Sequence, residues 1–290
     1  MVVDVHTHTP RRRTAAEPPP AGNAAWRPDQ ARPTSLTWDE QMEMLAPVSR
    51  AVVFNIAANP ISPTDDGGLI YPSPGVNNDT AAFVRAYPDK LIGFMTVHPD
   101  DPSCLDEIDR CRSDLGLQGV KLGPNYQNFD PLGVNAMRVF ARAEELGLPI
   151  LLHQGTSPNQ FADLDFAHPR HLDRVAVRFP RLRMVLAHMG HPWQVDCIAV
   201  IRKHPHLYAD ISAQFYRPWS YFNAFRLATE WGVLDKLLFG SDLPIATPQE
   251  TMDALWRVND VVVGTALPRV PEDALQRILD RDTLDLLGIG

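Results

Sequence analysis

The feature that most constrains the fold is a regular alternation of short apolar runs with amphipathic segments. The apolar runs are rich in Val, Leu and Ile and are apolar on both faces, which is typical of strands in a buried parallel sheet. Eight such strands are expected, at 2–5, 51–56, 91–97, 119–122, 149–152, 183–187, 207–210 and 237–239.

Helices are expected between these strands. Two capping boxes, Thr37 to Glu40 and Thr247 to Glu250, each predict a helix start. Apolar residues recur at the 3.6-residue period between Asn135 and Leu146. Further helices are expected at 79–87, 103–115, 169–179, 192–204, 219–231 and within 271–287.

This pattern predicts an α/β fold, a closed (β/α)8 TIM barrel that forms one domain over residues 1–290. An open, doubly wound sheet is the alternative. It is less favoured because no glycine-rich phosphate loop follows the first strand.

Two long segments rich in proline, 9–36 and 57–76, follow the first and second strands. Proline fixes φ and removes a donor, so both are expected to be irregular loops that shape the active-site mouth. The triplet Arg11-Arg12-Arg13 could select an anionic substrate, although a solvated run of charge is favoured.

Composition excludes several classes of protein. The chain has 35 acidic and 27 basic residues and a net charge of −8, which argues against nucleic-acid binding. No apolar run is long enough to span a bilayer. Three cysteines without a CxxC pair fit a reducing cytoplasm. A small-molecule substrate is therefore expected, and a homo-oligomer is left open.

The residues that could bind a metal or take part in catalysis lie at the ends of the expected strands. The first strand ends in His6 and His8, whose side chains share one face because a strand has a period of two. In a barrel, the carboxyl ends of all strands meet on one face. The other residues at this rim are His98, Lys121, His153, His188, Asp210 and Asp242.

Three imidazoles and a carboxylate suit a divalent ion with one open position. Zinc is the expected metal, and manganese is the alternative. Such an ion lowers the pKa of its water to about 7 and polarises a carbonyl. The sequence therefore predicts a catalytic metal site at this rim.

Three motifs resemble signatures of the amidohydrolase superfamily: Asp4-Val5-His6-Thr7-His8, Ala187-His188-Met189-Gly190 and Phe239-Gly240-Ser241-Asp242-Leu243-Pro244. They resemble most closely the amidohydrolase 2 branch. That branch includes aminocarboxymuconate-semialdehyde decarboxylase, resorcylate-type decarboxylases and pyrone-dicarboxylate lactonase. The resemblance extends from the first strand to the last.

The resemblance implies roles for these residues. His6, His8 and His153 would be metal ligands, and Asp242 would bind the metal or its water and move the proton. His188 would polarise the substrate or assist proton transfer. Asp4 faces the same way as His6 and would either contact the metal ligands or lie at the floor of the barrel.

Lys121 has two readings. In two-metal members of the superfamily a carboxylated lysine at this position bridges the metals, but Val120-Lys121-Leu122-Gly123-Pro124 resembles the one-metal branch. One metal is therefore expected, with Lys121 either binding the substrate or forming a structural ion pair inside the barrel mouth. Tyr216 and Arg217 follow the seventh strand and are expected either to bind a planar acid or to pack the loop.

Three functions are compatible with these residues. The favoured one is a hydrolase in which a metal-bound water attacks an amide, ester or lactone carbonyl. The alternative is a non-oxidative decarboxylase of a hydroxy-aromatic or muconate-type acid. A metal-binding scaffold without catalysis is the third, and the acid–base carboxylate argues against it.

Overall fold

Eight parallel strands form one sheet whose order follows the chain. The computed structural model describes residues 1–10, 27, 29, 36–57, 70–71, 73–158 and 162–289, and all structural statements concern these residues. The strands are β1 Val3–His8, β2 Arg50–Phe54, β5 Leu91–Thr96, β6 Gly119–Leu122, β7 Ile150–Leu152, β8 Met184–Leu186, β9 Leu207–Asp210 and β10 Leu237–Leu238.

The sheet curls until its two edges meet. Beyond β10, the chain runs alongside β1 and exchanges backbone hydrogen bonds with it. The amide of Val5 donates to the carbonyl of Phe239 at 3.0 Å, and the amide of His8 donates to the carbonyl of Leu243 at 2.8 Å. These bonds satisfy the free edge of β1, which an open sheet would leave exposed. The predicted (β/α)8 barrel is confirmed, and the open-sheet alternative is excluded.

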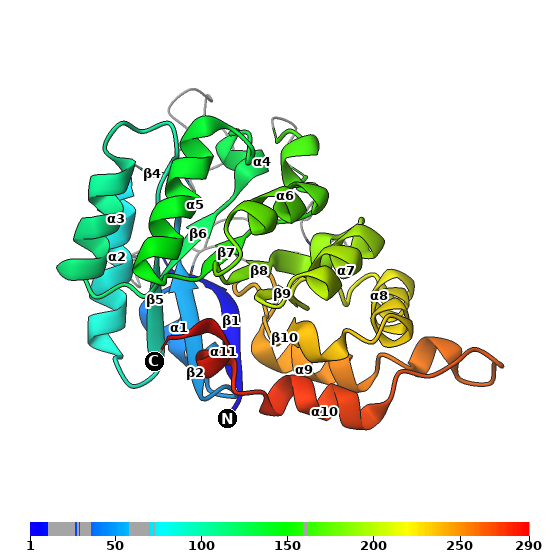
Figure 1. Ribbon diagram of the computed structural model, residues 1–290. Coiled ribbons are helices and arrows are strands. Elements are labelled where there is room, and N and C mark those ends of the chain that lie inside the picture. Colours follow the sequence, from blue (N-terminus) through cyan, green and yellow to red (C-terminus); the bar gives the residue numbers. More distant parts are fainter. Residues whose placement is uncertain are drawn as a thin grey trace.

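Helices connect the strands and cover the outside of the barrel (Figure 1). They are α1 Trp38–Met44, α2 Ser73–Ala86, α3 Cys104–Ser113, α4 Pro124–Gln127, α5 Val134–Leu146, α6 Arg170–Arg178, α7 Gln194–Lys203, α8 Pro218–Glu230, α9 Pro248–Trp256, α10 Glu272–Asp280 and α11 Thr283–Leu287. Both predicted capping boxes are present, at the starts of α1 and α9.

The segment between β2 and β5 differs most from the sequence predictions. Helix α2 begins at Ser73, so the irregular segment after β2 is shorter than expected. Proline lacks a backbone N–H donor. Pro74 is nevertheless compatible with this helix start, because backbone N–H groups of the first turn have no intrahelical acceptor. The same segment contains a small parallel pair, β3 Ile56–Ala57 with β4 Ile70–Tyr71. Arg11, Arg12 and Arg13 lie outside the described residues.

The apolar core has two layers. One layer lies between the sheet and the surrounding helices. The other fills the barrel interior with inward-facing side chains such as Val5, Phe94 and Val185, and it includes Leu284 and Leu287 of α11. Figure 1 shows this short helix, in red, beside β1 and β2 near the marked N-terminus. Helix α11 therefore closes the amino-terminal end of the barrel and leaves the opposite end for chemistry.

A search of the described residues finds no helix that combines the length and apolar character needed to cross a bilayer.

The closure by α11 predicts a stability effect. Leu287 is 1% exposed inside the barrel cluster. Replacing it with alanine should lower the free energy of unfolding by about 2–5 kcal/mol, because a buried leucine leaves a cavity. Urea unfolding measures this change. Leu267→Ala is the matched control, since Leu267 is 45% exposed. Equal effects of the two substitutions would contradict this role of α11.

Candidate metal centre

The predicted rim residues converge at the carboxyl end of the barrel. His6 and His8 lie on β1, Lys121 lies on β6, and His153 directly follows β7. His188 lies in a tight turn after β8, where its φ of 56° is left-handed. Its amide donates to the Asp210 carboxylate at 3.0 Å, which stabilises this uncommon conformation. Asp242 follows β10, also at a positive φ.

Two aspartates fix the backbone and the ring of His6. Asp4 accepts the amides of His6 and Ser241, each at 3.0 Å, and so joins β1 to the segment after β10. Burial raises the pKa of Asp4 to about 7. On the ring, Nδ1 of His6 donates to Oδ2 of Asp210 at 2.8 Å. This bond leaves Nε2 of His6 as a lone-pair donor for a metal.

The carboxylate of Asp210 is ionised although it is fully buried. Burial alone would raise its pKa, but His6, His188 and the Ser212 hydroxyl hold that pKa far below its usual range. An ionised Asp210 can only accept hydrogen bonds. The proton in the His6–Asp210 contact is therefore on the imidazole.

The rings of His153 and His188 each contact a backbone carbonyl. Nε2 of His153 lies 3.2 Å from the carbonyl of Gly155, and Nδ1 of His188 lies 3.3 Å from the carbonyl of Ser212. A carbonyl only accepts, so these nitrogens carry the protons. The lone pairs of His153 Nδ1 and His188 Nε2 then face each other at 3.2 Å.

Both of these imidazoles are neutral. Burial, reinforced by His188 and Lys121, holds the pKa of His153 well below its usual range. Burial likewise lowers the pKa of His188 to about 4. Two neutral nitrogens with facing lone pairs have no proton to share. A cation between them would satisfy both.

Asp242 brings negative charge to the same place. Its Oδ1 atom lies 3.2 Å from Nε2 of His6 and 3.1 Å from Nε2 of His8. Burial would raise the pKa of Asp242, but the neighbouring histidines hold it well below its usual range. Donor atoms of His6, His188 and Asp242 all lie within 4.8 Å of one another. This donor set fits a divalent cation.

That set of three differs from the predicted ligands His6, His8, His153 and Asp242. It includes His188, which sequence reasoning assigned to proton transfer. His8 joins the group through Asp242, and His153 joins it through His188. The ligand roles of His8 and His153 therefore stay predictions.

Lys121 is fully buried beside the donor group. Its Nζ atom lies 3.5 Å from Nε2 of His6 and 4.5 Å from the centre of the Phe54 ring. Burial lowers the pKa of Lys121 to about 7, against the opposing effect of Asp242 and Asp210. Lys121 lies below the pocket rather than among its lining residues.

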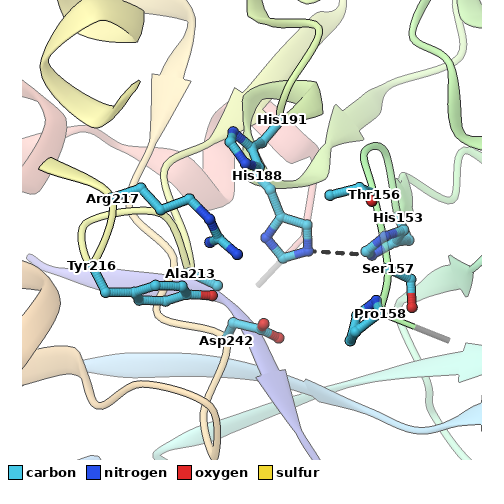
Figure 2. Close-up of a pocket in the computed structure, with 10 residues that line it drawn as sticks. All are labelled: His153, Thr156, Ser157, Pro158, His188, His191, Ala213, Tyr216, Arg217 and Asp242. Carbon is cyan, nitrogen blue, oxygen red and sulfur yellow. Dashed lines mark hydrogen bonds between the residues drawn. The ribbon is translucent and has the colours of Figure 1, made fainter. Parts of the chain in front are cut away.

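A pocket of about 200 Å³ opens above the donor group. Figure 2 shows Tyr216 and Arg217 on one side, Thr156, Ser157 and Pro158 on the other, and His188 and Asp242 between them. In the described part of the chain, no carboxylate pairs with Arg217 within 4 Å. An anionic group could therefore bind this guanidinium.

Sequence reasoning missed two residues that support the pocket. Arg27 lies over the rings of Phe215 and Tyr216, at 5.2 and 5.0 Å from their centres. No local pattern places this arginine beside the pocket, because the two rings that it covers lie far along the chain. Ser212 was also missed. It lies two residues after Asp210, the last residue of β9, and this is the same spacing as that of His6 and His8 on β1.

His98, by contrast, has a structural role. Its Nε2 atom donates to the carbonyl of Gln127 at 2.7 Å, and its Nδ1 atom accepts the amide of Asp100 at 3.1 Å. Both nitrogens are used within the fold. No ring nitrogen is left for a ligand.

Comparison with known proteins identifies the family. The sequence profile of the Amidohydrolase family, amidohydrolase 2 branch, matches residues 3–281. The chain therefore belongs to the amidohydrolase family, which confirms the resemblance seen in the sequence motifs.

Solved structures share the fold at low sequence identity. An uncharacterized TIM-barrel protein from Bordetella bronchiseptica is 21% identical, with a TM-score of 0.68, over 99% of this chain and 98% of its own. A probable 2-pyrone-4,6-dicarboxylic acid hydrolase from Acinetobacter baumannii is 16% identical, with a TM-score of 0.63, over 99% of both chains.

A third structure is a dihydroxybenzoic acid decarboxylase from Polaromonas sp. JS666 with bound manganese and the inhibitor 2-nitroresorcinol. It is 16% identical, with a TM-score of 0.66, over 99% of this chain and 96% of its own. Similar structures thus include both a hydrolase and decarboxylases, so the fold does not distinguish the two reactions.

The donor set predicts how metal binding responds to mutation. His6→Ala should reduce bound zinc or manganese from about one ion per chain to a small fraction, because the removed nitrogen is central to the group. Elemental analysis after dialysis measures the metal, and circular dichroism checks the fold. His171→Ala is the control, since His171 lies on α6 and bonds to the carbonyl of Asp165. Equal metal content in both variants would refute this centre.

Proposed function

We propose that the protein is a metal-dependent hydrolase that attacks a carbonyl of a small, carboxylated substrate. The observation that carries the proposal is the convergence of histidine ring nitrogens on the Asp242 carboxylate at the base of the pocket. A divalent ion held by this group would polarise the substrate carbonyl and lower the pKa of a water molecule. We propose one ion, zinc, with manganese as the alternative.

Asp242 is the proposed proton acceptor. It is ionised and lines the pocket, so it can take a proton from the attacking water and return it to the leaving group. His6 and His8 orient its Oδ1 atom from one side.

His188 is proposed to act on the substrate from the opposite wall. Its Nε2 atom carries the free lone pair, and the ring is neutral. A neutral imidazole in this position can accept a hydrogen bond from the reacting group or assist its proton transfer. His6, His8 and His153 are the remaining proposed ligands.

Arg217 and Tyr216, which line the pocket, are the proposed substrate-binding residues, and Lys121 is proposed to assist them from its buried position beside His6. A carboxylate on the substrate would pair with Arg217 in two parallel hydrogen bonds. The guanidinium lies 4.7 Å from the centre of the Tyr216 ring, which limits its movement. Tyr216 also offers an aromatic face to a planar substrate.

Decarboxylation is the second candidate. It needs the same metal and the same acid–base groups, with Asp242 or His188 donating a proton to carbon as carbon dioxide leaves. Its support is the fold shared with the manganese-containing decarboxylase. We place hydrolysis first because this chain has both His6 and His8 beside Asp242, whereas some decarboxylases of the branch have glutamate in place of the first histidine.

A substrate panel separates the two reactions. Lactones, esters, amides and hydroxybenzoates should be incubated with the metal-loaded protein, and both acid release and carbon dioxide should be measured. Acid release without carbon dioxide is expected. Asp242→Asn should lose turnover by more than about a hundredfold, since a general base contributes 10²–10⁴-fold. Carbon dioxide release alone would replace the proposal with its alternative.

The role of Arg217 can be tested with any substrate found. Arg217→Ala should raise KM for a carboxylated substrate about tenfold to a hundredfold, because a hydrogen bond to a charged group is worth about 1.5–3 kcal/mol. The KM for a neutral analogue should change little. Arg178→Ala, at the exposed end of α6, is the control. A similar rise for charged and neutral substrates would argue against carboxylate recognition.

A further inference from the structure

Ser212 has a position in the site that neither the motifs nor the comparisons assign. It lies two residues after Asp210, the last residue of β9, and is fully buried. Charged and imidazole groups surround it. Its Oγ atom lies 2.5 Å from Oδ1 of Asp210 and 2.8 Å from Nδ1 of His188. The hydroxyl thus connects Asp210 on β9 with the turn that carries His188.

The direction of these hydrogen bonds follows from proton counting. Oδ1 of Asp210 already accepts the amides of His188 and Ser212, so this oxygen is an acceptor and the single proton of the Ser212 hydroxyl goes to it. The lone pairs of Oγ then accept the Nδ1 proton of His188. A hydroxyl that donates to a carboxylate becomes a stronger acceptor, because linked hydrogen bonds polarise one another.

One carboxylate therefore orients two imidazoles. Oδ2 of Asp210 accepts from His6 directly, and Oδ1 reaches His188 through Ser212. The result is a continuous chain, His6–Asp210–Ser212–His188. In this arrangement Nε2 of His6 lies 3.2 Å from Oδ1 of Asp242, and Nε2 of His188 lies 3.2 Å from Nδ1 of the pocket residue His153.

We propose that Ser212 is a positioning residue whose hydroxyl holds the His188 ring with its proton on Nδ1 and its Nε2 lone pair facing the pocket. The catalytic consequence rests on the proposed function of His188. The orientation of the ring does not.

The turn itself does not need the hydroxyl. Asp210 also accepts the amides of His188 and Ser212, at 3.0 and 3.1 Å. Loss of Oγ leaves both of these bonds in place. Ser212→Ala should therefore fold normally and release the ring of His188, which keeps a longer, 3.3 Å contact with the Ser212 carbonyl. The His6 ring loses a 3.4 Å contact with Oγ but keeps its 2.8 Å hydrogen bond to Asp210.

Nitrogen NMR tests the orientation without any substrate. The full chain is labelled with ¹⁵N-histidine and freed of metal with a chelator, so that only protein groups set the tautomer. The His188 signals are assigned by their loss in His188→Gln. In the wild type, Nδ1 should have the shift of a protonated nitrogen and Nε2 that of an unprotonated one. In Ser212→Ala, the two shifts should move toward each other as the tautomers mix.

Ser220→Ala is the matched control. Its hydroxyl lies 3.4 Å from Nδ1 of another histidine, His191. The same change is therefore made beside an imidazole that is not part of the His6–Asp210–Ser212–His188 hydrogen-bond chain. The His188 shifts should stay at their wild-type values in this variant. Wild-type His188 shifts in Ser212→Ala would overturn the proposal.

Kinetics test whether Ser212 acts through His188. Ser212→Ala should lower kcat about tenfold to a hundredfold with little change in KM, as losses of such supporting hydrogen bonds do. Ser212→Thr, which keeps the hydroxyl, should recover part of this loss. In a His188→Gln background, Ser212→Ala should have no further effect, because the two residues act as one unit.

Full additivity of the two substitutions would overturn the proposal. If no substrate is turned over, the proposed function fails, but the NMR result still decides the role of Ser212. The two failures are therefore distinguishable.

Discussion

The site depends on one buried negative charge, the carboxylate of Asp210. It accepts hydrogen bonds from the His6 ring, the Ser212 hydroxyl and the amides of His188 and Ser212. A buried charge is costly unless it is fully hydrogen-bonded, and here both oxygens are satisfied. The same bonds that stabilise the charge also align three elements of the barrel. Electrostatic stability and ligand geometry therefore have one origin.

The sequence predicted those parts of the site that depend on local periodicity. Strand alternation placed His6 and His8 on one face, and the order of apolar runs placed His153, His188 and Asp242 on one rim. The same patterns predict the barrel, because each buried strand has an apolar run that is visible in its own sequence. These features need no knowledge of which segments touch.

The rest depended on contacts between distant residues. His188 lies in a left-handed turn that the Asp210 carboxylate stabilises, and no rule for strand ends predicts that conformation. Arg27 reaches the rings of Phe215 and Tyr216 across the barrel mouth. The roles of Asp210 and Ser212 also required the three-dimensional arrangement, since hydrogen-bond direction depends on which partners are ionised. Tertiary electrostatics, rather than local propensity, decided each of these cases.

The closure of the barrel has a consequence for synthesis on the ribosome. Asp4 accepts the amide of Ser241, 237 positions later in the chain, and the interior cluster is completed by Leu284 and Leu287. Strand β1 therefore emerges from the ribosome long before the segment after β10 that pairs with its other edge. Its apolar inward face stays uncovered in the meantime. Chains in this condition are prone to aggregation. A nascent chain that stalls before α11 would thus expose the interior of its own barrel, and such a chain is a natural client for chaperones.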